Sequence, residues 1–212
     1  MEQQLKSSEL SERMVEDAFF LFRQYGFRAI TMDDIAGHMG VSKRTLYAHF
    51  QDKDELVTTA IVTRMVIVRR ECERIREDAG DAIEEMILCM RYLDGLFRNT
   101  NPVFLLEMSK FHPVAYRHFQ RHRNEYLIPM IRTNLVSGVS QGLYRPDIDV
   151  NMLAVYRMES SMMCFRPALF PQDQFEMGKV HLRLMEHFLY GVATLKGYGL
   201  IGQYQQKYLQ NL

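Results

Sequence analysis

Residues 42–53 contain a dense set of side chains that could contact DNA. Two cations, a hydroxyl, a phenol and an imidazole are expected to point away from the apolar side of one short helix, at Lys43, Arg44, Thr45, Tyr47 and His49. Such groups suit phosphate oxygens and base edges. Lys53 follows at the start of the next predicted helix, close to where a phosphate would lie. A merely solvated helix face would leave the exposed Tyr47 unexplained.

The elements that position these side chains form a predicted helix-turn-helix. Thr31 and Asp34 fit a capping box at the start of the first helix, and Gly40 ends it because glycine accepts a positive φ angle. Ser42 caps the second helix, whose inner face is expected to carry Leu46 and Phe50. The second helix of such a motif enters the major groove of DNA.

Residues 8–57 resemble the N-terminal domain of TetR/AcrR-type bacterial transcriptional regulators. The resemblance lies in the string Thr45 to Phe50 followed by Asp52 to Leu56, together with the upstream residues Phe22, Gly26, Thr31, Ile35, Ala36, Gly40, Val41 and Ser42. We expect Thr31, Ser42, Tyr47 and Lys53 to hold phosphates. Lys43, Arg44, Thr45 and His49 are expected at base edges, although the residue types do not decide between Lys43 and Arg44.

Bulk composition bounds the class of protein. The 212 residues carry 26 cations and 26 acids, and 47% are hydrophobic. Residues 1–57 have a net charge of −3, but only Asp52 opposes three cations between Ser42 and Lys53. This distribution predicts weak non-specific DNA affinity and reliance on two subunits. No run reaches the roughly 18 apolar residues of a membrane span, and the polar N-terminus is unlike a signal peptide.

The positions of the cysteines and histidines predict neither a metal site nor a disulfide bond. Cys72, Cys89 and Cys164 are read as buried thiols of a reducing cytoplasm. His118 and His122 share a helix face, but three arginines surround them and no acid or cysteine completes a site. No catalytic motif appears either, so we expect no cofactor and no enzymatic activity.

Helical periodicity and stop signals predict an all-α chain. Helices are expected over 8–25, 52–80, 81–99, from Asn101-Pro102 to 111, over 114–141 with Pro129 either kinking the helix or dividing it into two pieces, over 150–165, and over 174–196 with Gly197 as the stop. We divide the chain into a DNA-binding domain, 1–57, and a helical effector-binding and dimerisation domain, 80–212. A linker helix over about 52–79 joins them.

Met and aromatic residues are frequent in the second domain. The resemblance implies a small-molecule pocket there, with candidates Met86, Met90, Tyr92, Phe97, Phe104, Met108, Phe111, Tyr126, Met130, Met158 and Met162. Tyr92, Glu107 and Glu159 are candidate polar anchors. Soft methionines adapt to varied ligands, but stripes at helical spacing also fit an ordinary core.

The last two predicted long helices are candidates for a dimer interface. In the family that the chain resembles, this helix pair forms a four-helix interface. Its positions here would be Met152, Val155, Tyr156, Glu159 and Met163 on one helix, and Val180, Leu184, Phe188, Val192 and Leu195 on the other. The same apolar positions could pack inside the monomer.

The sequence thus predicts a cytoplasmic, homodimeric, sequence-specific transcriptional regulator that associates with the bacterial nucleoid when bound to DNA. We expect a repressor released from a palindromic double-stranded operator by a small hydrophobic or amphipathic effector, without membrane contact. The alternatives are a ligand-independent DNA-binding activator or co-regulator, a helical protein–protein interaction module and a helical enzyme. Operator, effector identity and the sign of regulation are not readable from the residues.

Overall fold

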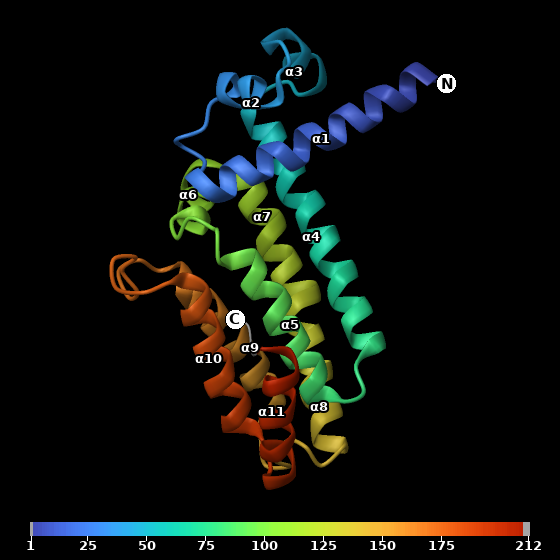
Figure 1. The fold of residues 1–212 in the computed structure, drawn as a ribbon, viewed down its shortest axis with the longest axis vertical. Coiled ribbons are helices and arrows are strands. Elements are labelled where there is room, and N and C mark those ends of the chain that lie inside the picture. Colours follow the sequence, from blue (N-terminus) through green and yellow to red (C-terminus); the bar gives the residue numbers. More distant parts are fainter. Residues whose placement is uncertain (1, 210–212) are drawn as a thin grey trace. The chain divides into compact units, whose positions relative to one another are not determined.

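The computed structural model describes the backbone of residues 2–209 and the side chains of residues 9–209. The fold is all-helical, as predicted (Figure 1). Its helices are α1 (Glu2–Tyr25), α2 (Met32–Met39), α3 (Lys43–His49), α4 (Lys53–Asp78), α5 (Ala82–Phe97), α6 (Phe104–Phe111), α7 (Pro113–His122), α8 (Ile128–Ser140), α9 (Val150–Met162), α10 (Met177–Val192) and α11 (Leu195–Tyr208). A π-helical turn, Arg123–Leu127, precedes α8, and a 3-10 turn, Met163–Phe165, follows α9. Within the described part, no helix has the length and apolar content needed to cross a membrane.

The chain packs into two compact units. The head unit comprises residues up to Val68 together with Asn99–Gln120, and the body unit comprises Arg69–Arg98 and the residues from Arg121 onward. The division falls inside α4, which runs without a break through both sets of residues. The functional boundary predicted near residue 57 stays a prediction, because packing units and functional domains need not coincide.

An aromatic cluster forms the centre of the head unit. Phe27 is fully buried, and its ring centroid lies 5.2 Å from that of Phe22 and 4.7 Å from that of Phe104 on α6. The backbone amide of Asn101 also donates to the carbonyl of Arg23 at 2.7 Å. The segment 99–120 therefore completes the core on which α1, α2 and α3 rest.

The body core lies among α5, α8, α9, α10 and α11. Tyr144 is fully buried in it, and its hydroxyl donates to the carbonyl of Ala82 at 3.0 Å and to Asn134 Oδ1 at 3.2 Å. Gly138 leaves room for the tyrosine ring, since a Cβ there would lie 2.0 Å from a ring carbon. The tail after Gly197, for which the sequence indicated no role, forms α11 and packs on α5.

Several predicted helix boundaries were wrong. The helix after Asn101-Pro102 begins at Phe104, because the Asn101 side chain caps a turn by accepting from the amide of Val103 at 3.1 Å. Pro129 lies in the first turn of α8, and of the two alternatives predicted for 114–141, a kinked helix or two pieces, the structure has two helices joined by the π-helical turn.

The last long helix ends at Val192 rather than at Lys196. Ala193 is extended, and the amide of Thr194 donates to the carbonyl of Leu143 at 2.9 Å. Thr194 then caps α11 by accepting from the amide of Gly197. Gly197 is needed for close packing, since a Cβ there would lie 2.2 Å from the Leu143 carbonyl oxygen, and it does not stop the helix.

Candidate nucleic-acid interface

The turn that orients the second helix has the predicted local chemistry. Thr31 Oγ1 accepts from the amide of Asp34, while the Asp34 carboxylate accepts from the amide of Thr31 at 2.8 Å and from its hydroxyl at 2.6 Å. These hydrogen bonds from Thr31 hold the pKa of Asp34 below its ordinary value. Gly40 has φ 67°, and the amide of Val41 closes the turn on the carbonyl of Ala36. The capping box and the left-handed glycine are confirmed.

α3 is fixed at its start by a cap and along one side by burial. Ser42 Oγ accepts from the amide of Thr45 at 3.0 Å and lies 2.7 Å from Thr45 Oγ1. Leu46 and Phe50 are buried, as predicted, which turns the remaining side chains of α3 outward.

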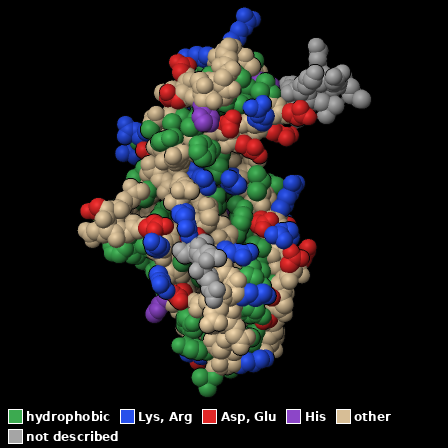
Figure 2. Space-filling model, viewed as in Figure 1, with side chains coloured by type: hydrophobic (Ala, Val, Ile, Leu, Met, Phe, Trp, Pro, Cys, Tyr) green, Lys and Arg blue, Asp and Glu red, His purple; other side chains and the backbone are tan. Residues whose placement is uncertain are grey.

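The outward face of α3 carries the predicted DNA-contact types. Lys43, Arg44 and Tyr47 are exposed, and Thr45 and His49 are half-buried. Tyr47 exposes 44% of its surface. Figure 2 shows Lys and Arg side chains over the region of α2 and α3. This face combines charge, hydrogen-bonding groups and an aromatic ring, the mixture that DNA recognition uses.

Lys43 is held by an intramolecular partner that the sequence did not indicate. Its ammonium lies 2.8 Å from Asp33 Oδ1 and 3.1 Å from Asp33 Oδ2, and 6.0 Å from the centre of the Tyr47 ring. The hydrogen bond and charge of Asp33 raise the pKa of Lys43 above its ordinary value. Within the described residues, Arg44 has no ion pair. The two neighbouring cations of the face therefore differ in how readily they can leave the protein for a phosphate.

Lys53 is turned toward the protein. Its ammonium donates to the carbonyl of Phe27 and lies 5.8 Å from the centre of the Phe22 ring. Burial lowers the pKa of Lys53, partly offset by the charge of Glu107. A phosphate contact from this ammonium would therefore require the side chain to turn outward.

Glu107 on α6 is a positioning residue that local sequence patterns could not reveal. Its carboxylate accepts from the amide of Arg28 at 3.1 Å, 79 positions earlier in the chain. It also fills the space beside Gly26, whose φ is 85°; a Cβ on this glycine would lie 2.8 Å from Glu107 Oε2. The turn between α1 and α2 is thus tied to α6 within the head unit.

Known transcriptional regulators are similar to this chain in sequence. Residues 15–60 match the sequence model described as bacterial regulatory proteins of the tetR family. Residues 15–60 are therefore similar to the DNA-binding part of this family. The chain is 31% identical over 109 residues to an uncharacterised HTH-type transcriptional regulator, YvaF of Bacillus subtilis, covering 50% of this chain and 56% of that protein. Over 164 residues it is 26% identical to the HTH-type transcriptional repressor KstR2 of Mycobacterium tuberculosis, and the match covers 68% of this chain and 72% of that protein.

Solved structures of transcriptional regulators have the same fold. The ketosteroid transcriptional regulator KstR2 of M. tuberculosis superimposes with a TM-score of 0.62 at 18% identity, covering 87% of this chain and 95% of that one. A TetR-family regulator from Agrobacterium tumefaciens superimposes with a TM-score of 0.75 at 14% identity, and the match covers 89% of this chain and 100% of that one. Both likenesses show that the chain has the fold of these regulators.

The residues predicted to line an effector pocket do not form one group. Phe104, Met108 and Phe111 belong to the head unit, and Phe104 packs in its aromatic core. The others belong to the body unit. Met86, Met90 and Met158 are buried in the body core, and Met162 packs against that core. The Phe97 ring lies edge-on to that of His181, with 4.8 Å between the ring centres. Met130 is half-buried. Tyr126 donates to the carbonyl of Arg69 at 3.2 Å, and burial raises its pKa to about 12.

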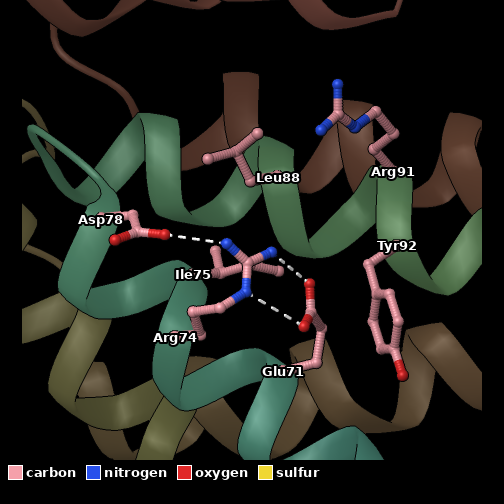
Figure 3. Close-up of a pocket in the computed structure, with 7 residues that line it drawn as sticks. All are labelled: Glu71, Arg74, Ile75, Asp78, Leu88, Arg91 and Tyr92. Atoms are coloured by element: carbon pink, nitrogen blue, oxygen red, sulfur yellow. Dashed lines mark hydrogen bonds and ion pairs between the residues drawn. The ribbon is translucent and has the colours of Figure 1, made fainter.

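A recess of about 210 Å³ lies between α4 and α5 in the body unit (Figure 3). Tyr92 is the only predicted pocket residue among those that line this recess. The remaining lining residues are Glu71, Arg74, Ile75, Asp78, Leu88 and Arg91. Arg74 extends between Glu71, at 2.5 and 3.2 Å, and Asp78, at 2.9 Å. Its guanidinium is thus neutralised by the protein itself.

The predicted dimer residues divide by helix. On α9, Met152, Val155, Tyr156 and Glu159 are exposed, and Met163, just beyond it, is half-buried. On α10, Val180, Phe188 and Val192 are buried within the chain, while Leu184 is half-buried. Leu195 is 96% exposed at the start of α11. The α9 face is therefore available to a second chain, whereas most of the named α10 positions already pack in the monomer.

Proposed function

We propose that this regulator is a homodimeric repressor that binds a palindromic operator and is released by a small hydrophobic or amphipathic effector. The observation that carries the proposal is the exposed face of α3, held by the caps at Thr31 and Ser42 and backed by the buried Leu46. The repressor KstR2 among the relatives supports the sign of regulation.

Each head would insert α3 into a major groove. Ser42, Tyr47 and Thr31 would contact phosphates, and Lys43, Arg44, Thr45 and His49 would reach base edges. Arg44 is the residue we expect to contribute first, since Lys43 must leave Asp33 and Lys53 must leave the Phe27 carbonyl. A helix of seven residues reads few base pairs, so a two-fold pair of heads is needed to specify a site.

The second copy is proposed to dock on α9. Met152, Val155 and Tyr156 form an apolar stripe at helical spacing on the outside of the body unit, and they expose 60, 44 and 53% of their surfaces. An isologous pair of such helices, completed by exposed or half-buried α10 residues such as Leu184 and His187, would cover that stripe. The interface proposed here therefore excludes Phe188 and Val192.

An effector bound in the body would change the spacing of the two heads. α4 is one helix of 26 residues shared by both units, so it is the proposed carrier of that coupling. The coupling is reciprocal: an effector that weakens operator binding must itself bind the operator complex more weakly. A variant that stiffens α4 should alter release while leaving operator affinity unchanged.

Selection from a random double-stranded DNA pool tests the proposal, with the wild type and Tyr47→Ala run in parallel. Enrichment of one palindromic motif by the wild type alone is the expected result, and its affinity should fall steeply with salt. An asymmetric motif would contradict the dimer, and failure to enrich any motif at low salt would contradict DNA binding by the isolated protein. A partner-binding module would also lack the salt dependence.

A further inference from the structure

α9 is built with its polar residues inside and its apolar residues outside. Met152, Val155 and Tyr156 face outward, whereas Arg157, Ser160 and Ser161 are almost completely buried. A surface helix normally shows the reverse pattern. The outer stripe is accounted for by the proposed dimer, but the inner polar face is not.

Arg157 is a buried cation without a counter-ion. It exposes 5% of its surface, and its Nε is shielded from solvent and has no hydrogen-bond partner. Among the described residues, none forms an ion pair or hydrogen bond with this guanidinium. The buried carboxylates of the body unit do not pair with it: Asp94 Oδ2 pairs with Arg98 at 2.6 Å, while Asp94 Oδ1 has no hydrogen-bond partner, and Glu85 accepts from Asn134 at 2.7 Å.

The surroundings of Arg157 leave it charged and uncompensated. Burial lowers the pKa of Arg157 to about 10, so the guanidinium is still protonated at neutral pH. The titratable groups that act on it are the thiols of Cys89 and Cys72 and the phenol of Tyr144, and none of them is a carboxylate. The hydrogen bond with Cys72 and burial raise the pKa of Cys89, and burial raises the pKa of Tyr144, so these two groups are neutral at that pH. An unpaired charge in such a place is costly, and natural structures rarely retain one without a partner.

A second buried group with an unpartnered polar atom, His181, lies beside the inner polar face of α9. Ser161 is one helical turn from Arg157, and its hydroxyl lies 3.5 Å from His181 Nε2 on α10. His181 is fully buried, its Nδ1 has no partner, and burial lowers its pKa to about 3, so the ring is neutral. When the serine hydroxyl donates to Nε2, the unpartnered Nδ1 carries the proton and becomes a hydrogen-bond donor.

We propose that Arg157, with Ser161 and His181, binds the carboxylate of an amphipathic effector whose apolar part lies among the neighbouring side chains of the body core. This inference rests on the proposed effector-regulated function and specifies the chemistry of the effector. A planar guanidinium matches a carboxylate with two parallel hydrogen bonds, and Nδ1 of His181 supplies a further donor. Met158 and Met185 provide apolar surface in the body core, and Phe97 provides it beside His181. The buried charge excludes cationic effectors of similar shape.

Binding of decanoate, compared with 1-decanol and decylamine, tests the inference by calorimetry on the full-length protein. We expect wild type to bind decanoate at least tenfold more tightly than the alcohol, with no binding of the amine. Arg157→Met, which keeps the side-chain length without the charge, should lose this preference and should fold, because an apolar replacement of a buried charge is tolerated. Arg132→Met removes an exposed arginine of α8 and should leave the preference unchanged.

Release of the selected operator, measured on the same samples, separates the two proposals. If decanol binds and releases DNA as well as decanoate does, effector regulation stands and the carboxylate site is refuted. An unchanged preference in Arg157→Met also refutes it. If decanoate does not bind wild type, the carboxylate site is refuted even where operator binding is specific. The wild-type comparison of acid with alcohol is decisive even without the variant.

Discussion

Gly138→Ala should destabilise the body unit strongly, although glycine-to-alanine changes in helices are ordinarily favourable. A Cβ at Gly138 would lie 2.0 and 2.2 Å from two carbons of the Tyr144 ring, far inside contact distance. Tyr144 cannot move freely, because it is fully buried and its hydroxyl donates to the carbonyl of Ala82 and to Asn134. The methyl group must therefore displace either the ring or the backbone of α8.

The magnitude follows from those contacts. Overpacking a core costs about 1–3 kcal/mol, and displacing a hydroxyl from buried partners adds about 1–3 kcal/mol. We expect the free energy of unfolding to fall by roughly 2–6 kcal/mol, a large fraction of the roughly 5–15 kcal/mol of a typical domain. Urea unfolding followed by circular dichroism measures the change.

Gly95→Ala on α5 is the matched control. This glycine is exposed, and a Cβ there meets nothing within 4 Å, so the same substitution should stabilise by about 0.5–1 kcal/mol. Tyr144→Leu combined with Gly138→Ala should be less destabilised than the sum of the single changes, since removing the ring removes the collision. A Gly138→Ala protein as stable as wild type would refute the packing argument.

Three further changes test the interface, the dimer and the buried histidine. Asp33→Asn frees Lys43 from its ion pair, so operator affinity measured by fluorescence anisotropy should rise and its salt dependence should steepen. Glu16→Gln, an equal charge change on α1, should raise the affinity less. A lower operator affinity of Asp33→Asn would contradict the idea that Asp33 competes with DNA for Lys43. Tyr156→Arg on the exposed α9 stripe should yield monomers in sedimentation velocity while the helical content is kept; an unchanged dimer would place the interface elsewhere. The folded pKa of His181 lies below its unfolded value of about 6.5, so the unfolded chain takes up the proton first. Stability should then fall as pH drops below 6.5, by up to about 1.4 kcal/mol per pH unit, and His181→Leu should lack that part of the slope.

The parts of the head that depend on neighbouring residues were predictable from sequence. The capping box at Thr31, the left-handed Gly40 and the cap at Ser42 each involve groups within three or four residues, and the structure has all of them. The inward positions of Leu46 and Phe50 follow from helical spacing alone. These signals were sufficient to place the candidate DNA-contact face on the outside of α3.

Features that depend on distant residues were not predictable. The ion pair of Lys43 with Asp33 joins two helices, and the link from Arg28 to Glu107 crosses 79 positions. The end of α10 depends on the loop at Leu143, which no local pattern near Lys196 reveals. Apolar spacing on α10 likewise could not tell a core face from an interface face, since both use the same residue types.

The affinity of the wild-type protein for its selected palindrome, compared with a duplex in which one half-site is scrambled, tests the central claim most directly. Two α3 helices, one from each subunit, should bind the intact palindrome with two chains per duplex and at least a hundredfold more tightly than the scrambled duplex. Equal affinities for the two duplexes, or one chain on the intact palindrome, would contradict recognition by a two-fold pair of heads.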